Sequence, residues 1–480
     1  MALFHATLLT LLILEGLLVS GNPLSCPRSV RRQDNLPVLR PHAAGIDIGS
    51  DFHVAAVSLD DALVEIHRFG ACTADLHQLA DWLTQHGVVT VAMESTGVYW
   101  IALYDLLETK GFEVLLVDPR QLNRVPGRPK SDPLDAQWIR RLHSYGLLNA
   151  AFRPEERIRV LRSYLRHRGN LVRYASHHIQ HMQKALEQMN VKLTEAVSDV
   201  TGKTGMRIIK AILEGERNPS ALATLRDPRC KQDPEQIGRA LQGTWREEHL
   251  FELKQAVSLY EYYHLQIADS DRQIESHLEK RGNPGVGTPP ASATKGARAK
   301  KPRGNSPAFD VRGQLYRMAQ VDLTAIEGIE ETTALTVLSE VGTDLSKWPT
   351  SGQFCSWLGL CPQVKQSAGK ILSSKVRPGP NRAAQALRLA ANSLQSSKSA
   401  MGSFFRRIAS RAGRAKAVTA TAHKLARLVY ALLKNGRASV AKGMEEYEEQ
   451  YKQRVLRSLT RKAEEMGYEL KEKQATEAKG

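Results

Sequence analysis

Four acidic residues in the first third of the chain have the types and spacing of a cation site. Asp47 interrupts an apolar stretch, AAGIDIGSDFHVAAVSL at 43–59, and a carboxylate is costly to bury there unless positive charge lies beside it. Glu94 ends a second apolar stretch, VVTVAME. Asp132 and Asp135 are three residues apart at the start of an expected helix, so they share one face. Carboxylates that converge in this way repel one another unless cations lie between them.

The chemistry that such a cluster favours is phosphodiester cleavage assisted by metal ions. Mg²⁺ prefers all-oxygen ligands of this kind. A pair of ions can activate the attacking oxygen of a phosphodiester reaction and stabilise the leaving oxygen. We therefore predict that Asp47, Glu94, Asp132 and Asp135 are catalytic and metal-binding, with two Mg²⁺ ions as the cofactor.

Each acid also has an ordinary structural interpretation. The run DPLD at 132–135 is a plain helix start, with Asp as N-cap, Pro at the first helical position and an acid in the first turn. Glu94 can be an ordinary strand end. Asp47 is the hardest to explain in this way, because it interrupts an apolar strand. Two further acids, Asp51 and Asp118, are interpreted as turn residues.

The elements that must position these acids follow from the apolar pattern. Residues 43–59 predict two strands joined by a tight turn at Gly49 and Ser50. Further strands are predicted at 62–71, 88–94 and 113–118, and helices at 73–85, 98–109 and 133–143. The order βββ-α-β-α-β-α is that of a ribonuclease-H-like fold, a mixed α/β sheet with helices on its faces. Asp47 then lies on the central strand, and Glu94 at the carboxyl end of a neighbouring parallel strand, where α/β sheets place their ligands.

Beyond the predicted sheet, the pattern changes to long helices. Apolar residues from 158 to 193 keep a heptad spacing that only Arg168 breaks, and a weaker seam runs from 250 to 278. These two long coiled-coil helices can pair with each other or across a dimer, and we favour a scaffolding role. Residues 282–307 are rich in Gly, Pro, Ala and Lys/Arg, which predicts a flexible linker.

The positive charge of the chain is concentrated near its C-terminal end. The formal charge is +17, and residues 345–444 hold 18 Lys and Arg and no Asp or Glu, whereas the remainder has 49 basic and 50 acidic residues. This is typical of a polyanion-binding surface, most often for nucleic acid. The candidate nucleic-acid-binding residues are Lys365, Lys370, Lys375, Arg377, Arg382, Arg388, Arg406 and Arg407.

The same region is predicted to be mostly helical. Residues 324–342 resemble a helix-hairpin-helix, whose turn amides face DNA phosphates. A small, polar loop follows at 363–375, then helices at 381–394 and 404–433. Residues 445–480 form a charged helical tail.

The N-terminal stretch and the cysteines bear on the compartment. Residues 2–21 are apolar like a signal peptide, but they lack a positive n-region and carry Glu15. We expect this stretch to be an appendage without targeting function, and no other segment is long and apolar enough to span a membrane. Five cysteines show no C-x-x-C spacing, which fits a reducing compartment. A cytoplasmic, nucleoid-associated protein is therefore expected.

Several stretches together resemble the DEDD transposases of bridge-RNA-guided insertion sequences. The motifs are GIDIGSDFH, AMESTGVYW, PGRPKSDPLDAQWIRRLHSYGLL, TAIEGIEETTA, FCSWLGLCP, SAGK and GPNRAAQALRLAA, and their order and spacing both fit. The resemblance implies a RuvC-like domain, a coiled coil and a C-terminal transposase domain. It places the family's metal-binding acids on Asp47, Glu94, Asp132 and Asp135. It also implies DNA partners, a structured guide RNA and a homo-oligomer, either a dimer or a tetramer.

The family also has a nucleophilic serine after a Gly-Leu-x-Pro turn, and Ser367 best fits that position. The family loop commonly reads Ser-Ser-Gly-Gly-Lys, whereas this chain has QSAGK at 366–370, so Ser373 and Ser374 stay as alternatives. Lys365, Lys370 or Arg377 would neutralise the attacked phosphate. The implied mechanism combines metal ions with a phosphoserine link that conserves the bond energy for rejoining.

The sequence thus predicts six regions. They are an extension of doubtful status at 1–42, a RuvC-like domain at 43–153, a helical region at 154–281, a linker at 282–308, a basic transposase domain at 309–444 and a tail at 445–480. The predicted function is that of an insertion-sequence transposase or recombinase that cleaves and exchanges DNA strands. Two alternatives are a metal-dependent junction resolvase or nuclease that never rejoins, and a non-catalytic nucleic-acid-binding protein whose acids are only caps.

Overall fold

A computed structural model describes residues 37–59, 63–122, 131–228, 232–280, 289, 304–379 and 381–470, apart from the side chains of 437–448 and 450. The chain divides into two compact units, Met1–Arg153 and Pro154–Gly480. Each unit is described by itself.

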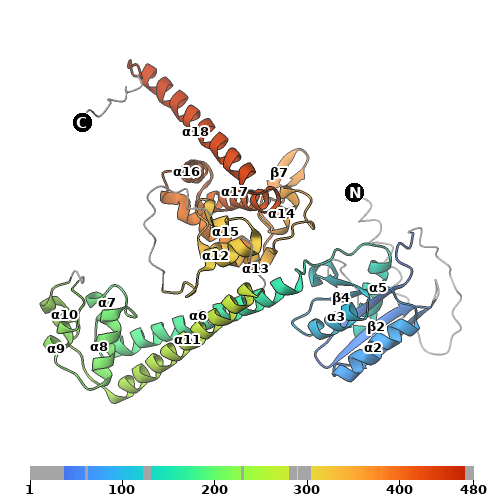
Figure 1. The fold of residues 1–480 in the computed structure, drawn as a ribbon, viewed down its shortest axis with the longest axis horizontal. Helices are drawn as coiled ribbons and strands as arrows, with labels where there is room; N and C mark the ends of the chain where they lie inside the picture. Colours follow the sequence, from blue (N-terminus) through green and yellow to red (C-terminus); the bar gives the residue numbers. More distant parts are fainter. Residues whose placement is uncertain are drawn as a thin grey trace. The chain divides into compact units, whose positions relative to one another are not determined.

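The first unit is a five-stranded mixed sheet with helices on both faces (Figure 1). The strands lie in the order β3-β2-β1-β4-β5; β1 is antiparallel to β2 and parallel to β4, and β5 is parallel to β4. Its elements are β1 (Ala43–Ile48), β2 (Phe52–Ser58), β3 (Val64–Gly70), α2 (Thr73–Gln85), β4 (Thr90–Glu94), α3 (Trp100–Thr109), β5 (Glu113–Val117), α4 (Pro119–Leu122) and α5 (Asp132–Ser144). The prediction of a mixed sheet with flanking helices is confirmed.

The two faces of the sheet are covered by different helices because successive strand residues point to opposite sides. On one face, Ala44 and Ile46 of β1 share a buried core with Leu79 of α2 and Leu103 of α3. On the other face, α5 packs against β1, β2 and β4. The face under α5 is therefore the one on which Asp47 lies, since Asp47 alternates with Ile46.

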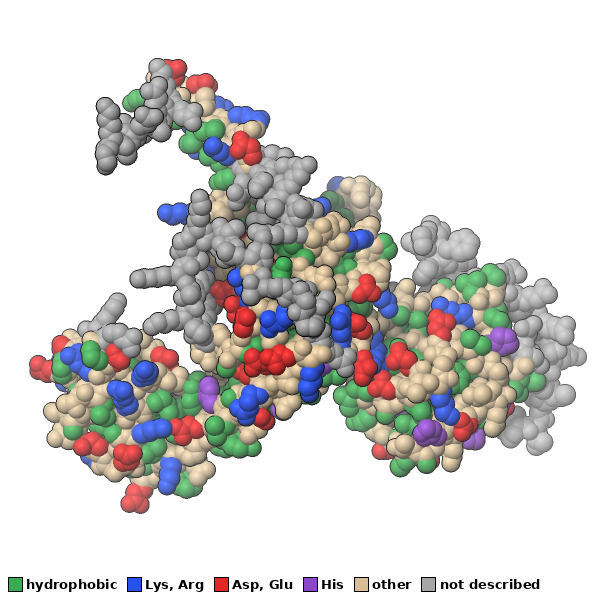
Figure 2. Space-filling view, viewed as in Figure 1, with side chains coloured by type: hydrophobic (Ala, Val, Ile, Leu, Met, Phe, Trp, Pro, Cys, Tyr) green, Lys and Arg blue, Asp and Glu red, His purple; other side chains and the backbone are tan. Residues whose placement is uncertain are grey.

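The second unit begins with two long helices that pack together along their length. They are α6 (Glu156–Gln188) and α11 (Glu247–Glu279), and they run antiparallel within one chain (Figure 1). Between them lie four short helices: α7 (Leu193–Ala196), α8 (Lys203–Leu213), α9 (Pro219–Thr224) and α10 (Pro234–Ala240). Figure 2 shows Lys and Arg side chains mixed with Asp and Glu over these short helices. On the face drawn there, both signs of charge are therefore mixed, unlike the acid-free stretch at 345–444.

Arg168, which breaks the predicted heptad seam, is buried in an ion pair. Its Nε donates to Oδ1 of Asp271 on α11 at 2.5 Å, and its Nη2 donates to the carbonyl of Asn305. Oδ2 of Asp271 accepts from the backbone N–H of Ala308. The pair thus joins α6 to α11 and also holds residues 305–308, the end of the stretch that the sequence predicts to be a linker.

The rest of the second unit is mostly helical, as predicted. Its elements are α12 (Val311–Ala319), η1 (Leu323–Ala325), α13 (Glu331–Val341), α14 (Ser351–Trp357), β6 (Lys365–Ser367), β7 (Lys370–Ser373), α15 (Arg382–Ser393), η2 (Leu394–Ser396), α16 (Ala400–Ala412), α17 (Arg414–Asn435) and α18 (Arg437–Glu465). Helices α13, α14 and α15 contact one another or α17, so α17 is central to this part.

Three local expectations differ from the structure. The first helix of the expected helix-hairpin-helix is only the three-residue 3₁₀ turn η1. The helix expected at 404–433 is two helices, because Gly413 adopts a φ of 87° and ends α16. The polar loop expected at 363–375 contains the two-stranded hairpin β6–β7.

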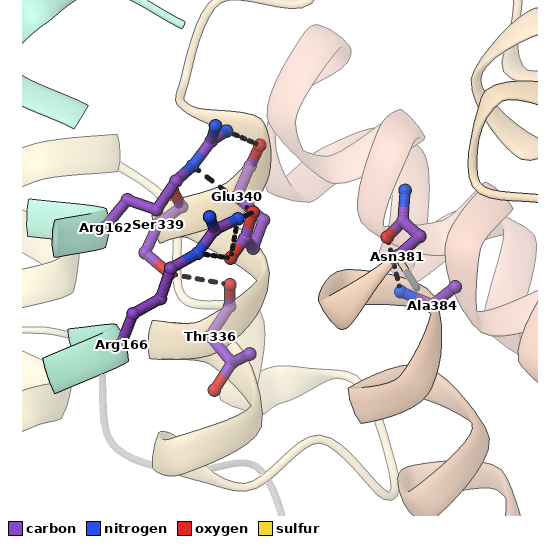
Figure 3. Close-up of polar contacts among 7 residues, drawn as sticks. All are labelled: Arg162, Arg166, Thr336, Ser339, Glu340, Asn381 and Ala384. Carbon is purple, nitrogen blue, oxygen red and sulfur yellow. Dashed lines mark hydrogen bonds and ion pairs between the residues drawn. The ribbon is translucent and has the colours of Figure 1, made fainter. Parts of the chain in front are cut away.

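Helix α6 is clamped to α13 by a buried carboxylate. The Glu340 carboxylate accepts three hydrogen bonds from Arg166: Nε donates to Oε1 at 3.1 Å, and Nη2 donates to Oε1 at 3.0 Å and to Oε2 at 2.8 Å (Figure 3). Arg162 lies one helical turn earlier, and its Nε and Nη2 donate to the carbonyls of Ser339 and Glu340. Both helices belong to the second unit, so these contacts hold α6 to the helical part of that same unit.

Among the helices within the described residues, none combines the length and apolar character needed to cross a bilayer.

Candidate functional site

The close packing of α5 on β1 creates the candidate site. A Cβ added to Gly45 would lie 2.2 Å from the backbone nitrogen of Arg140 and 2.4 Å from the carbonyl oxygen of Ala136. Only glycine permits this approach. Gly45 and Asp47 lie on the same face of β1, so the first turn of α5, which contains Asp132 and Asp135, comes to the region of Asp47.

Strand register brings Glu94 to the same place. β1 and β4 pair in parallel with Ile46 opposite Met93, so the next residues, Asp47 and Glu94, occupy equivalent positions on adjacent strands. Both follow buried apolar residues and both are only partly buried. Oε1 of Glu94 accepts a hydrogen bond of 2.8 Å from the hydroxyl of Thr96.

Electrostatics show that the four acids interact. The pKa of Asp47 is raised to about 6, first by burial and then by the negative charges of Asp135, Glu94 and Asp132, in that order. The other three predicted acids therefore lie close enough to Asp47 for their charges to act on it. Asp51, which the sequence assigns to a turn, is exposed between β1 and β2.

The helix start differs slightly from the expectation for 132–135. The N-cap of α5 is Ser131, and Asp132 is the first helical residue. The backbone N–H of Asp135 donates to the carbonyl of Ser131 at 2.9 Å. Asp132 is exposed and Asp135 partly buried, and both lie in the first turn of α5. Asp132 is therefore not the N-cap, although acids in the first turn are also an ordinary feature of helix starts.

The donor set fits a hard divalent cation. Four carboxylates whose mutual repulsion raises a pKa are stabilised by a cation between them, and all-oxygen ligands suit Mg²⁺. No group of three His, Cys, Asp or Glu side chains within the described part of the chain has the close spacing of metal ligands. The acids are thus gathered at one edge of the sheet but are not drawn in to ligand distances.

Ser367 lies in the second unit, at the end of β6. It pairs with Lys370 across a two-residue turn in which Ala368 and Gly369 have φ of 46° and 76°. Both positive φ values are those of a type I′ hairpin turn. Ser367 and the two flanking lysines, Lys365 and Lys370, are exposed, whereas the alternative Ser373 is partly buried.

The predicted basic residues divide by their contacts. Nη2 of Arg388 donates to the carbonyl of Gly359 at 3.1 Å, and Nη1 of Arg406 donates to the carbonyls of Gln395 and Ser397. These two arginines stabilise turns of their own domain. Of the other six, Arg382 is partly buried and five are exposed, as Arg406 is: Lys365, Lys370, Lys375, Arg377 and Arg407. The segment just before Ser131, NRVPGRPK at 123–130, also contains basic residues and lies outside the described residues.

Sequence reasoning missed two residues that shape the site. Gly45 is required because α5 packs closely against β1 at that position. In the sequence, the cue for this contact is a small residue two positions before an acid, on the same face of the strand. His143 was not singled out either. It is buried on α5, accepts from Arg40 at Nδ1 and contacts the Thr90 hydroxyl through Nε2, each at 2.9 Å. Burial and the Arg40 charge lower its pKa to about 4.

Two family models match separate parts of the chain. Residues 44–191 match a family model described as a DEDD transposase of the IS110 type. Residues 320–406 match a second model, described as the transposase IS116/IS110/IS902 family. The first match includes the four acids, and the second includes the β6–β7 hairpin. No curated protein matches the chain.

Proposed function

The chain belongs to the DEDD transposase family, and from this premise we propose that it cleaves and rejoins DNA with metal ions and a serine nucleophile. One observation carries the catalytic part of the proposal. The charges of Glu94, Asp132 and Asp135 act together on Asp47 at one edge of the sheet. The strand order β3-β2-β1-β4-β5 supports a ribonuclease-H-like, RuvC-like assignment for this unit.

In this proposal, Asp47, Glu94, Asp132 and Asp135 would hold two Mg²⁺ ions. Those ions would supply Lewis-acid stabilisation of the charge that develops on a scissile phosphate. The chain's own contribution is to hold its carboxylates at one place, through the Gly45 contact and the strand register. The first turn of α5 adds a positive helix end near a bound phosphate.

Ser367 would attack phosphorus. The Oγ–P bond forms while one bridging P–O bond of the DNA breaks; the serine hydroxyl loses its proton, and the released DNA hydroxyl takes one up. A hydroxyl of the exchanged strand then attacks the phosphoserine, which restores the serine and a phosphodiester. The exposed lysines Lys365 and Lys370 support this role, because they lie beside Ser367 in the hairpin and would provide positive charge for a phosphate there.

The acids and the serine lie in separate compact units. The serine that serves one acid cluster can therefore come from the same chain or from another copy, and we include a dimer or tetramer in the proposal. A structured guide RNA is also part of it, supported by the family resemblance and by the acid-free basic stretch at 345–444. The basic stretch suits DNA and RNA alike.

The test is a strand-exchange assay with purified full-length protein, Mg²⁺ and DNA carrying the ends of its element, with and without the adjacent non-coding transcript. Wild type is compared with Asp47→Asn and Ser367→Ala. We expect joined product and a covalent protein–DNA adduct in wild type only, and joining only when the RNA is present.

Two matched variants serve as controls. Asp118→Asn removes the acid that follows strand β5. Asp118 is not among the charges that raise the pKa of Asp47. Ser410→Ala removes an exposed serine hydroxyl of α16. Both should keep joining activity. Cleaved but unjoined DNA from Ser367→Ala would instead indicate hydrolysis by a resolvase-type nuclease, and full activity of Asp47→Asn would contradict metal-assisted chemistry at this cluster.

A further inference from the structure

A groove of about 830 Å³ lies between the base of the β6–β7 hairpin and helices α16 and α17. Its apolar wall includes Leu360, Val376 and Phe404. Its cationic side chains are Lys375, Lys416, Lys424 and Arg427. None of the described residues that line this groove is acidic. It therefore combines an aromatic, apolar wall with a positive charge that requires an anionic occupant.

The positive charges in and around the groove are crowded. Nζ of Lys424 lies 4.9 Å from the centre of the Phe404 ring, and Cζ of Arg407 lies 5.6 Å from the same centre. Burial, followed by the charges of Arg407, Arg427 and Arg454, lowers the pKa of Lys424 to about 8. These cations come from α16, α17 and α18. An anion bound among them would relieve their mutual repulsion.

We propose that this groove binds single-stranded nucleic acid, with one unstacked base against Phe404 and the adjacent phosphates on Lys424 and Arg427. Aromatic side chains and cations together are the elements with which proteins bind single strands, because every base offers a π-face to stack on. A duplex keeps its bases stacked within the helix, so it would leave the apolar wall without a partner. DNA and RNA single strands share this chemistry.

The groove adjoins the hairpin that bears Ser367. The backbone N–H of Gln363 donates to the carbonyl of Lys375 at 2.9 Å, and Pro362 pairs with Val376, so the hairpin base is also part of the groove wall. A strand held there is fixed to the same element as the proposed nucleophile. The inference rests on the proposed function only for the presence of nucleic acid, and the binding test below needs no catalysis.

The test measures binding of single-stranded oligonucleotides to the full-length protein by fluorescence anisotropy, as DNA and as RNA, over a range of salt concentrations. We expect Lys424→Gln and Arg427→Gln each to weaken binding and to reduce the slope of log K against log salt by about 0.7, the value of one phosphate contact on a single strand. Phe404→Leu should weaken binding between about fivefold and a hundredfold while leaving the salt slope unchanged.

Matched controls remove the same side-chain types outside the groove. Arg411→Gln changes an exposed arginine of α16, and Phe251→Leu changes an exposed phenylalanine of α11. Both should bind like wild type. An oligonucleotide with one 2-aminopurine gives a second readout, since its emission should change on binding to wild type but not to Phe404→Leu.

Several outcomes would overturn the proposal. Equal losses for groove and control variants would show a diffuse basic surface, and equal losses for duplex and single strand would show that no base is read. If only DNA or only RNA responds, the source of the strand is identified and the groove stands. If the wild-type protein joins DNA and the groove variants bind single strands normally, the groove proposal is refuted and the proposed function stands. If the groove variants alone lose binding but the wild-type protein joins no DNA, the groove proposal stands and the proposed chemistry is refuted.

Discussion

The backbone nitrogen of Arg140 lies so close to Gly45 that a Cβ at position 45 would be 2.2 Å from it. The contact is between backbones, so neither side can move without moving α5 or β1. The distance between the helix with Asp132 and Asp135 and the strand with Asp47 is therefore set by the absence of one methyl group.

The first prediction is that Gly45→Ala displaces α5. Overpacking of this kind costs about 1–3 kcal/mol. A displacement of about 1 Å would lower metal-dependent DNA cleavage roughly a hundredfold. Cleavage rates and thermal unfolding measure the two effects.

Gly169→Ala is the control. A Cβ at Gly169, on an exposed part of α6, would meet no atom within 4 Å, so this variant should be more stable than wild type by up to about 1 kcal/mol. Full activity of Gly45→Ala would show that the close contact does not position the acids.

A second prediction concerns Asp47 in the absence of divalent ions. Its folded pKa of about 6 is above the ordinary value of 3.8, so between these pH values the folded state binds more protons than the unfolded state. Stability therefore falls as pH rises through this window. At pH 7.5 without metal, Asp47→Asn should show slower hydrogen exchange in β1 than wild type.

With Mg²⁺ added, β1 of wild type should exchange more slowly than β1 of Asp47→Asn. The ion stabilises the charged carboxylates of wild type, and Asp47→Asn lacks one of them. Asp118→Asn should respond to Mg²⁺ as wild type does. Equal protection of wild type and Asp47→Asn by Mg²⁺ would mean that Asp47 is not a metal ligand.

A third prediction follows from the buried histidine of α5. Arg40 donates to Nδ1 of His143, so the neutral ring carries its proton on Nε2 and donates it to Thr90, whose hydroxyl donates to the Glu113 carbonyl. The folded pKa of His143 is about 4, below its ordinary 6.5. The neutral ring therefore makes its full contribution to the free energy of unfolding above pH 6.5. That contribution, about 3 kcal/mol in total, is lost as pH falls through about 4.

His143→Gln keeps an acceptor and a donor but cannot be protonated. With Mg²⁺ present, we expect the stability of the sheet to fall between pH 6.5 and 4 in wild type and to stay flatter in His143→Gln, as measured by hydrogen exchange. Without Mg²⁺ the Asp47 and His143 effects have opposite signs in overlapping windows, so wild type should show little net dependence there. A steep dependence that survives in His143→Gln would assign the acid sensitivity to another group.

A fourth prediction addresses the turn next to Ser367. Ala368 adopts a φ of 46°, a conformation that costs an L-residue roughly 1 kcal/mol and that glycine adopts freely. Ala368→Gly should therefore increase the hydrogen-exchange protection of β6 and β7 and should not reduce adduct formation with DNA. Gly369→Ala places a second Cβ at a positive φ and should have the opposite effect on protection. Faster exchange in Ala368→Gly would show that the turn is not type I′ in solution.

The sheet could be predicted because its strands are apolar runs separated by turn residues. Of the four acids, only Asp47 conflicts with its apolar run; Glu94, Asp132 and Asp135 were selected by their positions at a strand end and a helix start and by the family resemblance. The features that escaped prediction depend on contacts between distant segments. In the sequence, Gly45 appears only as a small residue two positions before an acid, which does not identify α5 as the element that touches it. Arg168 shows only as a break in a heptad until Asp271 is seen opposite. The β6–β7 hairpin has no apolar alternation, and β6 is exposed throughout, so the pattern at 365–373 carries no strand signal.

The last prediction concerns the clamp between α6 and α13 (Figure 3). Glu340 has only 8% of its surface exposed and faces both Arg162 and Arg166. Glu340→Gln leaves two guanidinium groups without their shared carboxylate, and removing one partner of a buried pair costs about 3 kcal/mol. Hydrogen exchange should rise in α6 and α13 while β1 keeps its protection, because the clamp lies wholly within the second unit. Glu155→Gln removes an exposed partner of Arg157 and should cost less than about 1 kcal/mol. Equal effects of the two variants would mean that the buried carboxylate contributes no more than a surface ion pair.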